Sequence, residues 1–285
     1  MIVSNVALLL WLAVTAYALP IGKPSGFTGR YGRLIVFGDS YSDNGNGAWT
    51  LTRLSNGPVW PTLLSNALGA DLIDYATGGA TADNSVVAGY TGPNSSLRVP
   101  SAHDQVARYL QMDRPRANDV FVHYIGANDP LFNTSVTGSE VSSIINADVD
   151  ALYRAGAKHF LLANYPPVST FPATYGEAPY PRIGPAYASS LDQGLSNIQA
   201  AWSAYVHVRI VHVQRLFADV VKQPQKYGVE ASYVDPPVAC LEGIYGTGER
   251  KLCTDPERHL FWDGYHPVAW VHERIAVLFE KALGA

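Results

Sequence analysis

Three residues that together can make a nucleophilic catalyst occur in this sequence, one near its start and two near its end. Ser40 follows a short apolar segment, and Asp263 precedes His266 by three residues. A serine hydroxyl is a poor nucleophile until a base takes its proton, and a histidine imidazole is the side chain suited to that task. An aspartate three residues earlier on a turn can accept the other ring N–H and fix the tautomer. We therefore predict acyl-transfer chemistry, with Ser40 as nucleophile and Asp263 and His266 as the pair that activates it.

The elements that must position these residues can be read from the alternation of short apolar runs with longer amphipathic ones. This alternation is typical of a parallel sheet covered by helices. We predict strands over residues 33–37, 72–76, 120–125, 159–164 and 208–213. We predict helices over residues 59–68, 104–111, 140–155, 186–205 and 268–283, and irregular stretches over 166–185 and 224–255. The fold class is therefore α/β, a three-layer α/β/α sandwich with a five-stranded, doubly wound parallel sheet.

Polar residues follow the first three predicted strands at their carboxyl ends, where open parallel sheets bind ligands. The blocks that could carry chemistry are residues 38–43, 77–81 and 126–129, together with residues 263–266 near the C-terminus. Each block alone is ordinary turn chemistry, and Asp39 and Asp43 are expected to hydrogen-bond the turn around Ser40. Asp129 is expected to brace its own loop. The order of the four blocks and their placement at strand ends favour one shared site.

These blocks resemble those of the SGNH (GDSL) hydrolase superfamily, which is named after Ser, Gly, Asn and His residues from four segments. The matching residues are Ser40, Gly79, Asn128 and His266. Residues 37–46 and 261–267 look like the fungal branch that includes acetylesterases of carbohydrate esterase family 16. The resemblance covers residues 33–267 and implies a flavodoxin-like SGNH fold. Residues 77–79 read Thr-Gly-Gly where many members have Ser-Gly or Ala-Gly, so either glycine could supply the family's amide, and we favour Gly79 from its position.

The resemblance also implies how the site works. Attack on an ester carbonyl creates an oxyanion, which needs hydrogen-bond donors where the charge develops. The implied donors are the amides of Ser40 and Gly79 and the side-chain amide of Asn128. The implied reaction is hydrolysis of short acyl esters, with acetyl groups on plant-wall oligosaccharides as the favoured substrate, through an acyl-enzyme and without a cofactor. Trp262 is expected to border the site and bind substrate, because flat rings suit the apolar faces of sugars.

Other functions are weighed against this one. A lipase or phospholipase would use the same residues on longer acyl chains, and the long irregular stretches could hold an apolar groove. A non-catalytic carbohydrate-binding protein is disfavoured by the intact Ser, Gly, Asn and His set. An α/β-hydrolase is disfavoured because the sequence has no Gly-x-Ser-x-Gly. His272 and Glu273 begin like a zinc-protease helix, but the second histidine is missing, so we expect no metal.

Composition and charge limit the class of protein. A chain of 285 residues with 47% hydrophobic and 15% charged residues can bury its own core, so we expect a single domain over residues 19–285 that works as a monomer. A net charge of -4 without clustered Lys or Arg argues against nucleic-acid binding and stable membrane association. The apolar run at residues 6–14 and the small-x-small pattern at 16–18 predict a signal peptide over residues 1–18, and hence a secreted, extracellular protein.

Two further features agree with export. Cys240 and Cys253, the only cysteines, lie in a loop rich in Gly, Pro and Asp, where a disulfide is the natural interpretation. Asn94 and Asn133 begin Asn-x-Ser sequons, which would be glycosylated in a eukaryotic secretory route and inert in a bacterial one.

Overall fold

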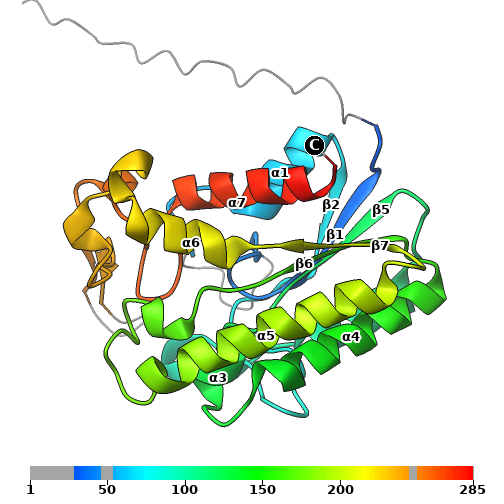
Figure 1. Ribbon diagram of the computed structural model, residues 1–285, viewed down its shortest axis with the longest axis horizontal. Coiled ribbons are helices and arrows are strands. Elements are labelled where there is room, and N and C mark those ends of the chain that lie inside the picture. The colour runs from blue at the N-terminus through cyan, green and yellow to red at the C-terminus, as the bar shows by residue number, and fades with distance from the viewer. Residues whose placement is uncertain (1–28, 46–53, 244–248, 285) are drawn as a thin grey trace, which may run out of the picture.

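The computed structural model of this chain describes residues 29–45, 54–243 and 249–284. The predicted signal peptide lies outside these residues. In the described part, five parallel strands form a central sheet in the order β2-β1-β5-β6-β7 (Figure 1). The strands are β1 (Arg33–Gly38), β2 (Asp71–Asp74), β5 (Asp119–Tyr124), β6 (His159–Ala163) and β7 (His207–Val211). All five predicted strands are confirmed, with ends that shift by one or two residues.

Helices cover both faces of the sheet, which makes the three-layer sandwich that the sequence predicts (Figure 1). One face carries α1 (Trp60–Leu68), α6 (Val213–Lys222) and α7 (Ala269–Ala282). The other face carries α2 (Ala102–Met112), α4 (Gly138–Ala155) and α5 (Tyr180–Trp202), while the short α3 (Asn128–Phe132) follows β5. None of the helices among the described residues has the length and apolarity needed to span a bilayer.

Strand β1 shows why the sheet lies in the middle. All six of its residues are buried, because a parallel sheet with helices on both faces has no solvent side. Leu34 and Val36 pack into the core under α1 and α7, whereas Ile35 and Phe37 pack into the core under α2, α4 and α5. The central strand thus joins two hydrophobic cores and is held rigidly up to its carboxyl end.

Two sequence-based expectations about helices are wrong. Helix α5 begins at Tyr180, inside the stretch predicted to be irregular, because Pro181 falls in the first turn, where its missing N–H has no intrahelical partner to lose. Helix α6 was not predicted, although Val213, Leu216, Phe217 and Val220 are its buried residues and have helical spacing.

Two short antiparallel hairpins also lie outside the predicted pattern. The first pairs β3 (Tyr90–Thr91) with β4 (Leu97–Arg98), and the second pairs β8 (Leu241–Glu242) with β9 (Lys251–Leu252). Strands of two residues are too short to show an alternation of polar and apolar residues.

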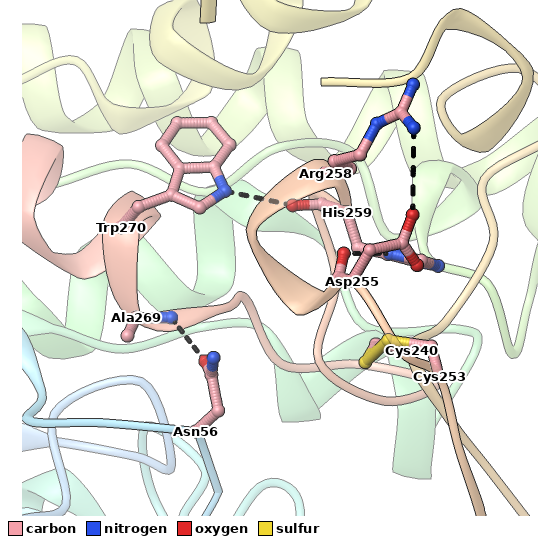
Figure 2. Close-up of a disulfide and its surroundings, with 8 residues drawn as sticks. All are labelled: Asn56, Cys240, Cys253, Asp255, Arg258, His259, Ala269 and Trp270. Carbon is pink, nitrogen blue, oxygen red and sulfur yellow. Dashed lines mark hydrogen bonds and ion pairs between the residues drawn. A yellow bond between two sulfur atoms is a disulfide. The ribbon is translucent and has the colours of Figure 1, made fainter. Parts of the chain in front are cut away.

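The predicted disulfide joins Cys240 to Cys253 and closes the second hairpin (Figure 2). The amide of Cys240 donates to the carbonyl of Phe261 at 3.1 Å, and the amide of Leu241 donates to that of Trp262 at 2.6 Å. The side chain of His259 lies within 4.8 Å of both sulfurs, but a disulfide offers no thiolate to a metal. The cross-link therefore braces the segment that leads directly into Asp263.

Candidate active site

Ser40 lies in a tight turn just beyond the end of β1. The amides of Ser42 and Asp43 both donate to the carbonyl of Asp39 at 3.0 Å, and the amide of Tyr41 donates to the Asp39 carboxylate at 3.1 Å. The predicted roles of Asp39 and Asp43 in this turn are confirmed, since Asp43 also accepts the amide of Gly45 at 2.9 Å. The turn therefore fixes the backbone on both sides of the predicted nucleophile.

The residue before the turn, Gly38, is held from both sides. A Cβ at this position would lie 2.6 Å from the carbonyl oxygen of Tyr124 on β5, so only glycine fits. On the other side, the buried side chain of Gln105 on α2 makes two hydrogen bonds to Gly38. Its Oε1 accepts the Gly38 amide at 2.8 Å and its Nε2 donates to the Gly38 carbonyl at 2.9 Å. The amide of Thr77, just after β2, also donates to the Gly38 carbonyl at 3.1 Å, so Gln105 and this segment share that carbonyl.

The two glycines of the second block differ in how their amides are hydrogen-bonded. The amide of Gly78 donates to the carboxylate of Asp43 at 2.7 Å and is therefore occupied. No hydrogen bond within the described part of the chain uses the amide of Gly79. Gly79 has φ +86°, and a Cβ there would lie 2.0 Å from the carbonyl oxygen of Tyr90. This arrangement agrees with the choice of Gly79 as the oxyanion donor, and it packs the β3–β4 hairpin directly against that donor.

Asn128 is anchored through one of its two amide hydrogens. Its Nδ2 donates to the carbonyl of Ala80 at 2.8 Å, which leaves the second N–H for a substrate. Asp129 accepts the amide of Ala82 on its carboxylate at 3.1 Å, as expected of a loop brace. The third block is therefore tied to the end of the second block and to Ala82, the residue that follows it.

The last block brings its two predicted residues into direct contact. Nδ1 of His266 lies 2.8 and 2.9 Å from the two carboxylate oxygens of Asp263. Oδ1 of Asp263 also accepts the amides of Tyr265 and His266, both at 2.9 Å. Because Nδ1 contacts the carboxylate, a proton exchanged with a nucleophile would pass through Nε2. The hydroxyl of Tyr41 donates to the carbonyl of Tyr265 at 2.8 Å and so links this block to the first.

One cavity collects the predicted residues. It has a volume of about 410 Å³, and Ser40, Gly79, Asn128 and His266 all line it. Asp263 is buried behind His266. Trp262 is not among the lining residues and instead packs against the core under α7. The rings that do line the cavity are Tyr41, Tyr90, Phe132, Phe171, Tyr180 and Tyr265.

Two buried carboxyl groups flank the predicted oxyanion site. Burial raises the pKa of Asp39 to about 6, although a hydrogen bond from the Tyr165 hydroxyl favours the charged form. Burial also raises the pKa of Asp129 to about 7, and the negative charge on Asp39 adds to this rise. A charged carboxylate beside a developing oxyanion would oppose it. Because their pKa values are raised, both carboxyl groups are partly protonated in mildly acidic solution and carry less negative charge there.

Sequence reasoning missed Gln105, Tyr41 and the β3–β4 hairpin as parts of this site. Gln105 and Tyr41 act through contacts with residues 67 and 224 positions away, which no local pattern reveals. Tyr41 does have a local signal, because it directly follows the predicted nucleophile. Only the fold brings Tyr90 of the hairpin against Gly79.

The five-stranded parallel sheet and the cavity that holds the four predicted residues agree with a carboxylic ester hydrolase. The chain belongs to the GDSL-like lipase/acylhydrolase family, whose model matches residues 34–279. It is similar to the phosphatidylcholine-sterol acyltransferase of Aeromonas hydrophila, with 28% identity over 81% of this chain and 72% of that protein. It is also similar to the acetylesterase of Hypocrea jecorina, with 25% identity over 82% of this chain and 83% of that protein.

A solved structure shares the fold. The carbohydrate acetylesterase of Sinorhizobium meliloti superimposes with a TM-score of 0.51 and 15% identity, over 88% of this chain and 99% of that one. The resemblance to SGNH hydrolases that the sequence suggested is thus confirmed.

Proposed function

We propose that this protein is a secreted serine esterase that removes acetyl groups from plant-wall oligosaccharides. The observation that carries the proposal is the convergence of Ser40, Gly79, Asn128 and His266 on one cavity, with Asp263 bound to Nδ1 of His266. The similarity to an acetylesterase agrees with the acyl group. We further propose that residues 1–18 are a signal peptide and that residues 19–285 form one monomeric domain. The Cys240–Cys253 disulfide supports secretion, because disulfides persist in oxidising environments.

The reaction proceeds through an acyl-enzyme in this proposal. Nε2 of His266 takes the proton of the Ser40 hydroxyl as its oxygen attacks the ester carbonyl carbon. The carbonyl electron pair moves onto oxygen, where the amides of Ser40 and Gly79 and the Nδ2 of Asn128 donate to it. The carbon–oxygen bond to the sugar then breaks, and His266 returns the proton to the departing alcohol. A water molecule then attacks the carbonyl carbon of the acetyl-serine while Nε2 of His266 takes its proton. The bond to the Ser40 oxygen breaks, acetate leaves, and the proton returns to Ser40.

The cavity wall agrees with a neutral, carbohydrate-bearing ester. Asp43 and His266 are the acidic and basic side chains among its lining residues. Asp43 is committed to the amide of Gly78. Tyr90, Tyr180 and Tyr265 offer both a flat apolar ring and a hydroxyl, and this combination suits a pyranose, which has an apolar face and polar edges.

Release of acetate tests the proposal directly. The purified protein is incubated with acetylated xylo-oligosaccharides, and acetate is measured beside a Ser40→Ala control. Acetate release that the control lacks is expected. An active Ser40→Ala variant, or no release from any acetyl ester, would refute the proposal.

A second candidate is a lipase acting on longer acyl chains, and the apolar part of the cavity favours it. Leu54, Leu131, Phe132 and Phe171 line the same space, and one similar protein is an acyltransferase named for phosphatidylcholine. Rates on p-nitrophenyl acetate and p-nitrophenyl octanoate separate the two functions. A higher kcat/KM on the octanoyl ester would favour the lipase.

A further inference from the structure

Both predicted glycosylation sequons lie at the rim of the active-site cavity. Asn94 is in the turn between β3 and β4, and its neighbours in that turn, Gly92 and Ser95, line the cavity. Asn133 directly follows Phe132, which also lines the cavity. Two sites separated by 39 positions in the sequence therefore flank the same opening.

The two sites belong to a single wall of that opening. The ring of Tyr90 on β3 packs edge-on against the ring of Phe132, with centroids 6.1 Å apart. Tyr90 in turn lies against Gly79, because its carbonyl oxygen occupies the place where a Gly79 side chain would begin. We call Tyr90, Phe132 and the turn at residues 92–96 the hairpin wall. Groups attached at Asn94 and Asn133 would both project from it.

Both asparagine side chains are accessible for modification. Each residue is exposed. The Oδ1 of Asn133 accepts the amide of Ser135 at 3.0 Å. This bond does not involve the Nδ2 of Asn133, which is the atom that carries a glycan. Within the described residues no hydrogen bond engages the side chain of Asn94, whose backbone has the left-handed φ of 54°. Neither modification requires a buried contact to break.

We propose that N-glycans on Asn94 and Asn133 form a steric rim at the hairpin wall that admits short acetylated oligosaccharides and hinders long polysaccharide chains. The proposal rests on the esterase function and on export through a eukaryotic secretory route. A glycan is bulky and strongly hydrated. One beside the opening obstructs a chain that extends across the hairpin wall, whereas a small ester can enter the cavity without crossing that wall.

The modification is a group transfer from a lipid-linked oligosaccharide diphosphate. A bond forms between the asparagine Nδ2 and the anomeric carbon of the oligosaccharide. The bond from that carbon to the diphosphate oxygen breaks, the lipid diphosphate leaves with the electron pair, and Nδ2 loses one proton.

The full-length chain secreted from yeast provides the test. Peptide mass spectrometry measures occupancy at Asn94 and Asn133. The kcat/KM values for p-nitrophenyl acetate, an acetylated xylo-oligosaccharide and acetylated xylan are then compared before and after enzymatic trimming of the glycans, and in the Asn94→Gln/Asn133→Gln variant. We expect both sites to be occupied, and we expect glycan loss to raise kcat/KM on the polymer severalfold while the value for p-nitrophenyl acetate stays constant.

A remote glycan is the matched control. Ser203→Asn combined with Tyr205→Thr creates a sequon on exposed residues just before β7, at the end of the sheet opposite the site. A glycan there should leave the polymer-to-oligomer ratio unchanged. Unoccupied sites in the secreted protein, or equal changes on all three substrates, would overturn the steric rim while leaving the esterase intact. Absence of activity on every acetyl ester, trimmed or not, would overturn the proposed function and the rim with it.

Discussion

The hydroxyl of Tyr41 donates a 2.8 Å hydrogen bond to the carbonyl oxygen of Tyr265, across 224 positions of sequence. Tyr41 follows Ser40, and Tyr265 precedes His266. The bond therefore connects the backbone beside the nucleophile to the backbone beside the base. We infer that it helps to position the two reacting side chains relative to each other.

Replacing Tyr41 with Phe removes this link and little else. We expect kcat to fall a few-fold to about tenfold with KM nearly unchanged, since such a bond contributes about 1 kcal/mol. Tyr175→Phe is the matched control, because it deletes an exposed hydroxyl bond to Asp235. Steady-state kinetics on p-nitrophenyl acetate compares the two variants. Equal kcat values would show that the link does not position the catalytic groups.

Gln105 is expected to act as a positioning residue for Ser40. Gln105→Leu leaves the buried amide of Gly38 without this partner, which costs about 1–3 kcal/mol, whereas the Gly38 carbonyl keeps its bond from the Thr77 amide. We expect a lower melting temperature and, in the folded protein, a lower kcat at similar KM. Gln199→Leu also removes a side-chain bond to a strand carbonyl, that of Val208. It should lower the melting temperature alone, and a matching loss of kcat there would rule out a specific role for Gln105.

Asn128 is expected to stabilise the oxyanion through the N–H that Ala80 does not use. Asn128→Ala should lower kcat by about a hundredfold to a thousandfold and leave KM nearly unchanged. Because the variant also loses the bond to Ala80, its circular dichroism and melting curve are recorded alongside the kinetics. An unchanged kcat would remove Asn128 from the mechanism.

Asp129 should make stability depend on pH. Burial raises its pKa from 3.8 to about 7 in the folded protein. Between these values the folded state holds a proton that the unfolded state has lost, so stability falls as pH rises from about 4 to 7. Asp129→Asn removes this titration. The melting temperature of the variant relative to the parent should therefore increase from pH 4 to pH 7, and a constant difference would contradict the assigned cause.

The strands and the four blocks were predictable because each depends on local sequence. Residues 34–37 of β1 are apolar and lead through Gly38 and Asp39 to Ser40, and parallel strands place their carboxyl ends at one edge. Helix α6 also has a local signal in the spacing of Val213, Leu216 and Val220, but it was not predicted. Its start only two residues after β7 left no turn signal to separate it from that strand.

The walls of the cavity were not predictable, because contacts between distant segments determine them. Trp262 was expected at the site from its place next to Asp263. The bridges of Phe261 with Ala239 and Pro267 fix the path of this segment, and Trp262 packs against the core. Tyr90 enters the site only because Gly79 lacks a side chain. Contacts of this kind can be identified only when the positions of distant segments in the folded chain are known.

In the proposed mechanism, Ser40 is the nucleophile that His266 activates. The most direct measurement is labelling with a fluorophosphonate, followed by peptide mass spectrometry, in the parent and in the Ser40→Ala and His266→Ala variants. We expect a single adduct on Ser40 of the parent, with loss of esterase activity in step with labelling. We expect no adduct on the Ser40→Ala variant and strongly slowed labelling of His266→Ala. An unlabelled Ser40 in an active protein, or equally fast labelling without the histidine, would contradict it.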